Sequence, residues 1–197
     1  MVTLDAPLTR ILGCKCGATD DGTVEDYDFV TYKTGEIYVP SEFHFIETRM
    51  TAYVDPSQLY SNMRYSVMSA CDAAKIAQRS FALDRFHRDP NIPDERADQV
   101  MHDWLFDLEA TCTIIGIPGA AFLAYKDEDD LRRLMLGAVA PEAQRQGIGR
   151  NLWLSAIAFS DKTVVADILA HNPIINLYAS FGAKFCNVIN TYHYHRG

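Results

Sequence analysis

The stretch that decides the fold of this 197-residue chain reads Leu136-Gly137-Ala138-Val139-Ala140-Pro141-Glu142-Ala143-Gln144-Arg145-Gln146-Gly147-Ile148-Gly149-Arg150-Asn151-Leu152. An apolar run typical of a strand ends at Ala140-Pro141, a loop with two glycines follows, and an apolar helix begins at once. Such a junction leaves backbone N–H groups without partners at the positive end of a helix dipole, which favours anion binding. Gly147 and Gly149 have no Cβ, so a phosphate can approach the main chain closely. On pattern alone, a tight turn before a core helix remains the alternative.

The spacing of these glycines argues against two common phosphate-binding loops. The stretch is not G-x-G-x-x-G, and no Gly-Lys-Ser/Thr follows it, so neither a Rossmann loop nor a Walker loop is predicted. Further along, Ile148, Leu152, Ala156 and Phe159 fall on one stripe of the predicted helix. This stripe is expected to pack the helix against a sheet.

The pattern around the loop predicts a mixed α/β domain over residues 63–197. A helix capped by Asp72 and a second helix beginning near Asp94 are expected to follow a first strand. The acidic run 127–130 is expected at an exposed hairpin tip. Strands are predicted at 63–70, 111–117, 120–125, 131–139, 164–170, 184–189 and 191–195, and further helices at 150–160 and 173–181. The expected order is βααβββαβαββ.

Residues 1–62 differ in composition from the rest of the chain and are predicted to form a small β-rich N-terminal module. From residue 23 to residue 56 the chain is rich in Tyr, Val, Phe, Thr and Ile, with breaks at Gly35 and Pro40. Short strands are expected at 29–32, 36–39 and 43–54, because these residue types favour strands. Residues 55–62 are expected to form the boundary.

Two segments resemble motifs of the GNAT acetyltransferases. Gln144-Arg145-Gln146-Gly147-Ile148-Gly149 resembles that family's Q/R-x-x-G-x-G/A pyrophosphate loop, and the segment 176–183, Asn-Leu-Tyr-Ala-Ser-Phe-Gly-Ala, is similar to its L-Y-x-x-x-G-F/A segment. The resemblance covers residues 63–197. It implies the GNAT fold, a mixed and mostly antiparallel sheet flanked by helices. It also implies acetyl-CoA as cosubstrate, transfer of acetyl to an amine, and a homodimer as in many relatives.

The resemblance also implies which residues hold the cofactor. The backbone amides of Arg145, Gln146, Gly147, Ile148, Gly149 and Arg150 would bind the CoA pyrophosphate, and the main chain from Leu136 to Val139 would meet the pantetheine arm. The family usually has Asn seven residues before its Tyr. This chain has His171 there and Asn172 one position later, so a one-residue shift is expected to restore the contact. Position 183 is Ala rather than the commoner Phe.

Tyr178 is the residue expected to act in chemistry. When an amine attacks a thioester, a thiolate leaves, and a nearby phenol can protonate it. The alternative is a tyrosine that packs in the core with its hydroxyl at the surface. The general base stays unassigned: His171, His193, His195 and Glu142 are suitable by type, and a chain of water molecules would also serve.

A narrower resemblance concerns the acceptor. The segments Ser80-Phe81, 85–90 and 191–196, together with Trp104, resemble the dTDP-fucosamine acetyltransferase branch, which implies a nucleotide-linked amino sugar as acceptor. The basic residues Arg85, His87 and Arg88 could then bind its diphosphate, or they could be a solvated loop paired with Asp84 and Asp89. Two other hypotheses stay open. One is a GNAT enzyme acting on a protein N-terminus, a polyamine or an antibiotic, and the other is a non-catalytic acyl-CoA-binding module.

Composition argues against other classes of protein. Lys and Arg number 18 against 26 Asp and Glu, for a net charge of −8, which disfavours binding to nucleic acid. No apolar run approaches the roughly 20 residues of a membrane span, and residues 1–10 lack the features of a secretory signal, so a cytoplasmic location is expected. The cysteines lack zinc-site spacing, so no metal is predicted; they are Cys14, Cys16, Cys71, Cys112 and Cys186.

Overall fold

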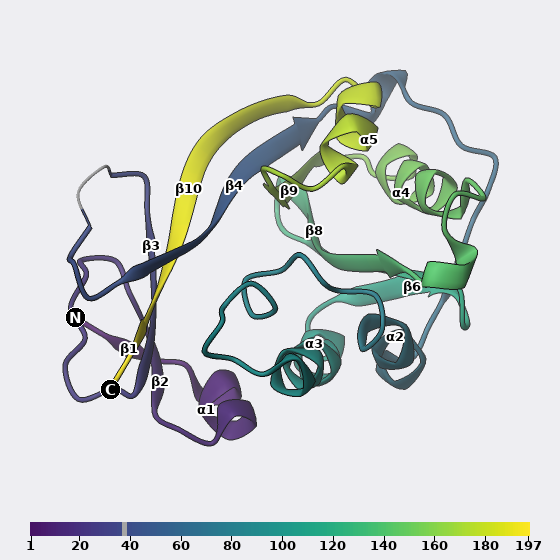
Figure 1. Cartoon of the computed structure of the whole chain (residues 1–197). Helices are drawn as coiled ribbons and strands as arrows, with labels where there is room; N and C mark the ends of the chain where they lie inside the picture. Colours follow the sequence, from purple (N-terminus) through teal and green to yellow (C-terminus); the bar gives the residue numbers. More distant parts are fainter. Residues whose placement is uncertain (37–38) are drawn as a thin grey trace.

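A single mixed sheet runs through the chain (Figure 1). The computed structural model describes residues 1–36 and 39–197, and within these the sheet has ten strands in the order β1-β2-β3-β10-β4-β9-β8-β7-β6-β5. The strands are β1 (Thr3–Leu4), β2 (Cys16–Thr19), β3 (Phe29–Thr34), β4 (His44–Val54), β5 (Ser66–Val67), β6 (Thr113–Ile117), β7 (Ala121–Asp127), β8 (Leu131–Val139), β9 (Thr163–Leu169) and β10 (Lys184–His195). The mixed α/β fold predicted from the sequence is confirmed.

Helices cover both faces of the sheet from β5 to β9 (Figure 1). The helices are α1 (Ala6–Leu12), α2 (Ala70–Ala77), α3 (Asp94–Glu109), α4 (Ile148–Ala158) and α5 (Ile174–Ser180), with short 3-10 turns at Pro56–Gln58 and Pro141–Ala143. Neighbouring residues of a strand point to opposite faces. Ile114 and Phe122 therefore pack with α2 and α3, whereas Ile115 and Leu123 pack with α4 and α5.

Three helix starts show how local sequence sets the boundaries. Ser69, not Asp72, caps α2, because its side chain accepts a hydrogen bond from the backbone N–H of Asp72. Asp5 caps α1, a helix that the β-rich description of residues 1–62 did not include. Gly147 lies at the N-cap of α4 with a left-handed φ of 78°, so this helix begins at Ile148, two residues earlier than predicted.

The N-terminal strands belong to the same sheet as the rest of the chain. β4 lies between β10 and β9, and β3 pairs with the other edge of β10. Sheet pairing therefore continues across the boundary predicted at residue 62. The division of the chain into an N-terminal module, residues 1–62, and a domain, residues 63–197, stays a prediction. The strand expected at 36–39 includes residues 37 and 38, which lie outside the described residues.

Two predicted strands differ from the structure. The last two, 184–189 and 191–195, are one long strand, β10, interrupted by a bulge between Cys186 and Ile189 where Asn187 has a φ of 53°. The strand continues past the bulge in its pairing with β4 and is expected to bend there, since a bulge bends and twists its strand. The strand expected at 63–70 contains only Ser66–Val67, at the edge of the sheet.

Asp89 ties the loop between α2 and α3 to the last strand. One carboxylate oxygen of Asp89 accepts hydrogen bonds from His193 Nδ1 at 2.6 Å and from His195 Nε2 at 2.7 Å. Burial raises the pKa of Asp89, but the bonds from both histidines outweigh it and hold that pKa below its usual value. Asp89 is 2% exposed, so the carboxylate is buried with its partners.

Replacing Asp89 with Ala is expected to lower the free energy of unfolding by about 3 kcal/mol, because it leaves a buried histidine without its partner. Urea unfolding followed by circular dichroism measures this loss. Asp130→Ala, on the exposed loop after β7, is the matched control and should change stability by less than about 0.5 kcal/mol. Equal stability of the two variants would contradict a role for Asp89 in holding the loop.

Candidate functional site

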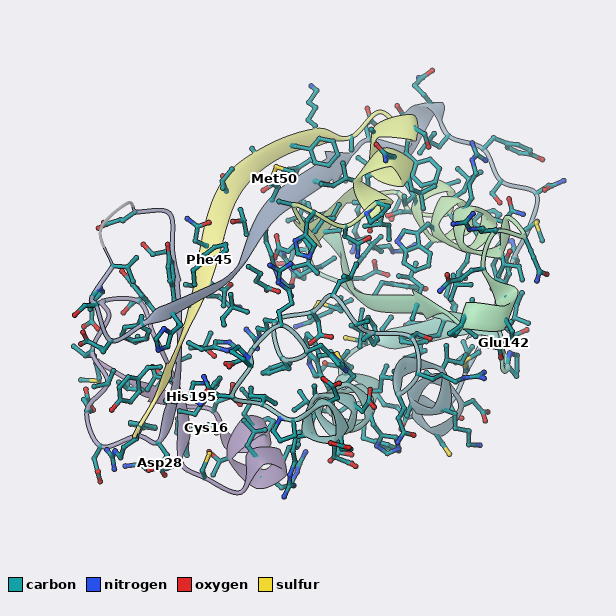
Figure 2. All side chains as sticks on the ribbon, viewed as in Figure 1. Cys16, Asp28, Phe45, Met50, Glu142 and His195 are labelled. Atoms are coloured by element: carbon teal, nitrogen blue, oxygen red, sulfur yellow. The ribbon has the colours of Figure 1, made fainter. Side chains whose placement is uncertain are left out.

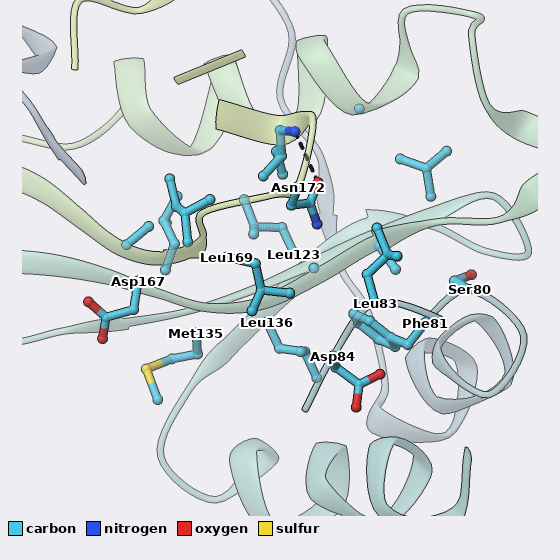
Figure 3. A pocket seen from close by; sticks show the side chains of 18 of the residues that line it. Ser80, Phe81, Leu83, Asp84, Leu123, Met135, Leu136, Asp167, Leu169 and Asn172 are labelled. Atoms are coloured by element: carbon cyan, nitrogen blue, oxygen red, sulfur yellow. Dashed lines mark hydrogen bonds between the residues drawn. The ribbon is translucent and has the colours of Figure 1, made fainter. Parts of the chain in front are cut away.

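A cavity opens where β8 and β9 separate. The two strands are parallel and pair from Leu131 to Leu134 and from Thr163 to Ala166, and beyond these residues no pairing between them continues in the described chain. The cavity has a volume of about 640 Å³, and residues 134–139 and 166–169 line it. Asn172 lies on one side of it and Phe81, Leu83 and Asp84 on the other (Figure 3).

A bulge in β8 accompanies this separation. Tyr125 of β7 pairs with Leu134, whereas the preceding Ala124 pairs with Leu136, so Met135 is an extra residue on β8. A bulge bends its strand and increases the local twist. The edge of β8 from Met135 to Val139 that turns toward β9 therefore lacks a strand partner. Its peptide groups can bind an extended ligand as a neighbouring strand would.

The loop 144–150 presents a group of free amides. Among the described residues, none of the backbone carbonyls accepts a hydrogen bond from the backbone N–H groups of residues 145 to 150, and the first such bond joins Asn151 to Gly147 at 3.0 Å. Gly147 and Arg145 adopt left-handed φ angles of 78° and 61°. A Cβ on Gly149 would lie 3.0 Å from Val139 Cγ2, so a glycine there lets the loop approach the strand end closely. This geometry suits a phosphate.

The side chains of the predicted loop take different positions. Arg150 reaches the cavity wall, together with Gly149, whereas Ile148 packs into the core. Gln146 is exposed and donates from Nε2 to the carbonyl of Glu142 at 3.0 Å. Arg145 is exposed at the turn. The anion site therefore consists mainly of backbone groups, with Arg150 as the basic side chain of this loop that lines the cavity.

Tyr178 lines the cavity from α5 and is 3% exposed. Its hydroxyl oxygen accepts a hydrogen bond from Trp153 Nε1 of α4 at 3.0 Å. Because the indole is only a donor, the proton of Tyr178 is left for another acceptor. Burial raises the pKa of Tyr178, so the phenol keeps its proton near neutral pH. This arrangement can donate a proton into the cavity.

Asn172, rather than His171, lines the cavity. The Asn172 side-chain oxygen accepts from the backbone N–H of Ile174 at 3.0 Å, which fixes the side chain at the start of α5 (Figure 3). His171 Nε2 lies 2.8 Å from Arg88 Nη1. The position expected from the one-residue shift is therefore the one beside the cavity, and the role of Asn172 in binding stays a prediction.

The basic cluster predicted around residue 85 does not act as one group. Arg85 lines the cavity. His87 lies between Asp84 and Asp98, and Arg88 Nε donates to the carbonyl of Ile46 at 3.0 Å. Of the three predicted basic residues, Arg85 alone faces the cavity.

The residues suggested by type as general bases lie elsewhere. His193 and His195 share Asp89, and burial lowers the pKa of His193 to about 4. Glu142 pairs with Arg79 at 2.7 Å, near the start of α4 and far from His195 (Figure 2). With His171 facing Arg88, none of the four lines the cavity.

Three further charged residues, not predicted from the sequence, line the cavity. Asp167 of β9 accepts from Thr51 Oγ1 at 2.8 Å at the point where β8 and β9 separate. Lys33 of β3 and Arg49 of β4 join Arg85 on the wall. The available signal was weak: Asp167 interrupts an apolar strand, but charged residues in strands usually mark a solvated face.

Repulsion among the cations shifts a pKa. The charge of Arg85, followed by burial and by Arg49, lowers the pKa of Lys33 to about 8. Arg49 Nε binds Glu47 Oε1 at 2.6 Å, and Glu47 is completely buried. The wall therefore brings three cations together, and Arg49 is the one that pairs with an acid among the described residues.

One group of described residues has the composition of a metal site. Ligand-type atoms of Asp89, His193 and His195 all lie within 4.8 Å of one another. The nitrogen atoms of both histidines already face one oxygen of Asp89 as hydrogen-bond donors. The expectation that the chain binds no metal stays a prediction.

Comparison with solved structures places the fold. A GNAT-family protein from Novosphingobium aromaticivorans superposes with a TM-score of 0.58 at 12% identity, over 98% of this chain and 81% of that one. GCN5-related N-acetyltransferases from Kribbella flavida and Sphaerobacter thermophilus both give a TM-score of 0.54, at 14% and 9% identity, over 86% and 85% of this chain and 69% and 59% of theirs. No protein-family model and no curated sequence matches the chain. The chain therefore has the GNAT fold.

None of the described helices combines the length and the apolar character needed to cross a lipid bilayer.

Replacing Arg85 with Gln is expected to raise the pKa of Lys33 from about 8 toward its ordinary value of 10.5, because the strongest repulsion is removed. Titration of the Lys33 side-chain resonance by NMR, assigned with Lys33→Arg, measures the change. Arg79→Gln is the control, since Arg79 pairs with Glu142. An unchanged Lys33 pKa in Arg85→Gln would show that the two charges do not interact.

Proposed function

We propose that the chain is an N-acetyltransferase that moves the acetyl group of acetyl-CoA to the amine of a small acceptor. The observation that carries this proposal is the group of free amides at residues 145–150, located beside the unpaired edge of β8. The GNAT fold supports it. The motif resemblance at 144–149 and at Tyr178 agrees with it.

In this proposal the diphosphate, the pantetheine arm and the thioester of acetyl-CoA each contact a different part of the site. The diphosphate would accept hydrogen bonds from the amides of residues 145–150, at the positive end of the α4 dipole. The pantetheine arm, which carries amides, would pair with the β8 edge from Met135 to Val139. The thioester would then lie near Tyr178 and Asp167, which both line the cavity.

The transfer itself requires two proton movements. The neutral amine attacks the thioester carbonyl, a C–N bond forms, and the C–S bond breaks with the electron pair remaining on sulfur. In this proposal Tyr178 protonates the thiolate, and the role is supported by a hydroxyl proton that is not used in the bond from Trp153. Asp167 is our candidate to accept the proton of the amine, either directly or through water, because it is an acid on the cavity wall.

The acceptor expected from the narrower resemblance, a nucleotide-linked amino sugar, stays a candidate. Its diphosphate could use Arg85, but His87 and Arg88 have protein partners instead. The other acceptors, a protein N-terminus, a polyamine or an antibiotic, belong in the same assay. A non-catalytic acyl-CoA-binding protein would bind CoA and acetylate none of them.

Replacing Gly147 with Ala is expected to weaken CoA binding by about 10-fold or more, because an L-residue disfavours the left-handed conformation that directs the amides. Isothermal calorimetry with CoA measures the affinity. Gly182→Ala is the matched control. Gly182 has a φ of 76° and an equally open Cβ position but lies at the end of α5, outside the loop 144–150, so the same strain should leave the CoA affinity unchanged. If both variants change the CoA affinity equally, the loop 144–150 does not bind CoA.

Replacing Tyr178 with Phe is expected to lower kcat by about 100-fold or more and to change the Kd of CoA by less than about 3-fold, because the phenol acts on the leaving thiolate. Release of free CoA from acetyl-CoA in the presence of the amine panel measures turnover. Tyr53→Phe, a half-buried tyrosine of β4, should keep full activity. Full turnover by Tyr178→Phe would exclude the proton-donor role.

A further inference from the structure

Three cationic side chains meet on one wall of the cavity. Lys33, Arg49 and Arg85 come from β3, from β4 and from the loop after α2, and all three line the cavity. Their charges act on one another, since both arginines lower the pKa of Lys33. Like charges held together destabilise the folded chain unless a counterion lies between them. This concentration occurs in a chain whose net charge is −8.

In the described part of the chain, Arg85 and Lys33 have no ion-pair partner, whereas Arg49 pairs with Glu47. The Arg85 guanidinium stacks over the ring of Phe86, with the ring centroid 4.6 Å away. Among the described residues, none forms a hydrogen bond or an ion pair with it, and the acids near it act only through their charge. A guanidinium has five N–H donors in a planar fork, which suits a carboxylate or a phosphate. Its donors therefore remain for a ligand in the cavity.

Most of the nearby acids have partners outside the cluster. Glu47 is already bound through Oε1 to Arg49 Nε at 2.6 Å. Asp167 accepts from Thr51 Oγ1 and lies on β9, which β10 and β4 separate from the strand of Lys33. Asp84, which also lines the cavity, accepts hydrogen bonds from the His87 ring and from the backbone N–H of Phe86. Among the described residues, Arg49 is therefore the one cation of the three that pairs directly with an acid.

Behind the cations lies a row of buried polar atoms without hydrogen-bond partners. The row comprises Thr31 Oγ1, Glu47 Oε2, Thr191 Oγ1 and His193 Nε2. Thr191 pairs in register with Lys33 on one side and with Glu47 on the other, and His193 pairs with Thr31, so all lie on the sheet face that carries Lys33. Glu47, Thr191 and His193 are fully buried. Buried polar groups normally have partners, so the interior beneath the three cations is unusually polar, although none of these four residues lines the cavity itself.

We infer that the acceptor of the proposed acetyl transfer carries a carboxylate or phosphate group, which binds to Arg85, Lys33 and Arg49. This inference rests on the proposed function, because it names the substrate class of that reaction. The acceptor is thus an amine that is also an anion, such as an amino acid or a phosphorylated amino sugar. Simple amines and polyamines lack the anionic group and would meet repulsion from the same wall.

The positions along β4 limit the length of this acceptor. Arg49 lies two residues before Thr51, the partner of Asp167 where the strands separate. Two residues of a strand span about 7 Å. An amine beside Asp167 and an anion beside Arg49 are therefore separated by only a few bonds, with allowance for the reach of the side chains. This distance favours a small acceptor over a protein.

Matched pairs of amines test this inference with acetyl-CoA as donor. Glucosamine 6-phosphate is compared with glucosamine for the phosphate arm, and serine with ethanolamine for the carboxylate arm. In at least one pair, the amine that carries the phosphate or carboxylate should have a kcat/KM about 10–100-fold higher than the amine that lacks it. The arm with the larger ratio identifies the anion.

Arg85→Gln should remove this preference by lowering kcat/KM for the anionic member alone, with the Kd of CoA unchanged. Arg79→Gln should behave as the wild type, because Arg79 pairs with Glu142 and is not among the residues that line the cavity. A direct binding measurement accompanies the kinetics: inorganic phosphate and acetate are titrated against the Lys33 side-chain resonance. A saturable shift is expected with the preferred anion, and its loss in Arg85→Gln.

The results separate this inference from the transferase proposal. If CoA binds, but Lys33 responds to neither anion and no pair shows a preference, the anionic acceptor is wrong and the transferase proposal stands. Equal loss of activity on both members of a pair in Arg85→Gln would also overturn it. If CoA does not bind but Lys33 still responds, the transferase proposal fails and the anion site remains.

Discussion

The separation of β8 from β9 is the constraint on which the rest of the structure depends. Only four residue pairs join these parallel strands, and the bulge at Met135 turns β8 away after them. A parallel sheet that continued to pair would bury its backbone groups and leave no cavity between the strands. Because the pairing stops, β8 from Leu134 to Val139, Gly149 and Arg150 in the first turn of α4, and Tyr178 border one space.

The cationic wall of this cavity depends on contacts between distant parts of the chain. Asp89 connects the loop that carries Arg85 to the last strand, through two histidines that are more than 100 positions away. β4 and β10 bring Arg49, Glu47 and Thr191 beside that loop. Residues before position 62 therefore shape the side of the cavity opposite the cofactor motif. This arrangement gives the N-terminal strands a role in choosing the acceptor under the proposed function.

The sequence predicted the features that are encoded locally. The strand–loop–helix junction at 136–152, most helices and strands, and the position of Tyr178 on a short helix follow from periodicity and glycine placement. It did not predict the single strand β10, because the bulge is defined by the pairing of β10 with β4, which is distant in the sequence. Nor did it identify Lys33, Arg49 and Asp167, since charged residues in strands are ordinary until the topology places them on one cavity.

The central claim is that backbone amides before α4 bind the diphosphate of CoA, and amide NMR tests it most directly. Titration of the 15N-labelled protein with CoA should shift the backbone resonances of residues 145–150 and of the β8 edge, and dephospho-CoA should do the same because it keeps the diphosphate. Large shifts elsewhere, with the resonances of residues 145–150 unmoved at saturation, would contradict the account.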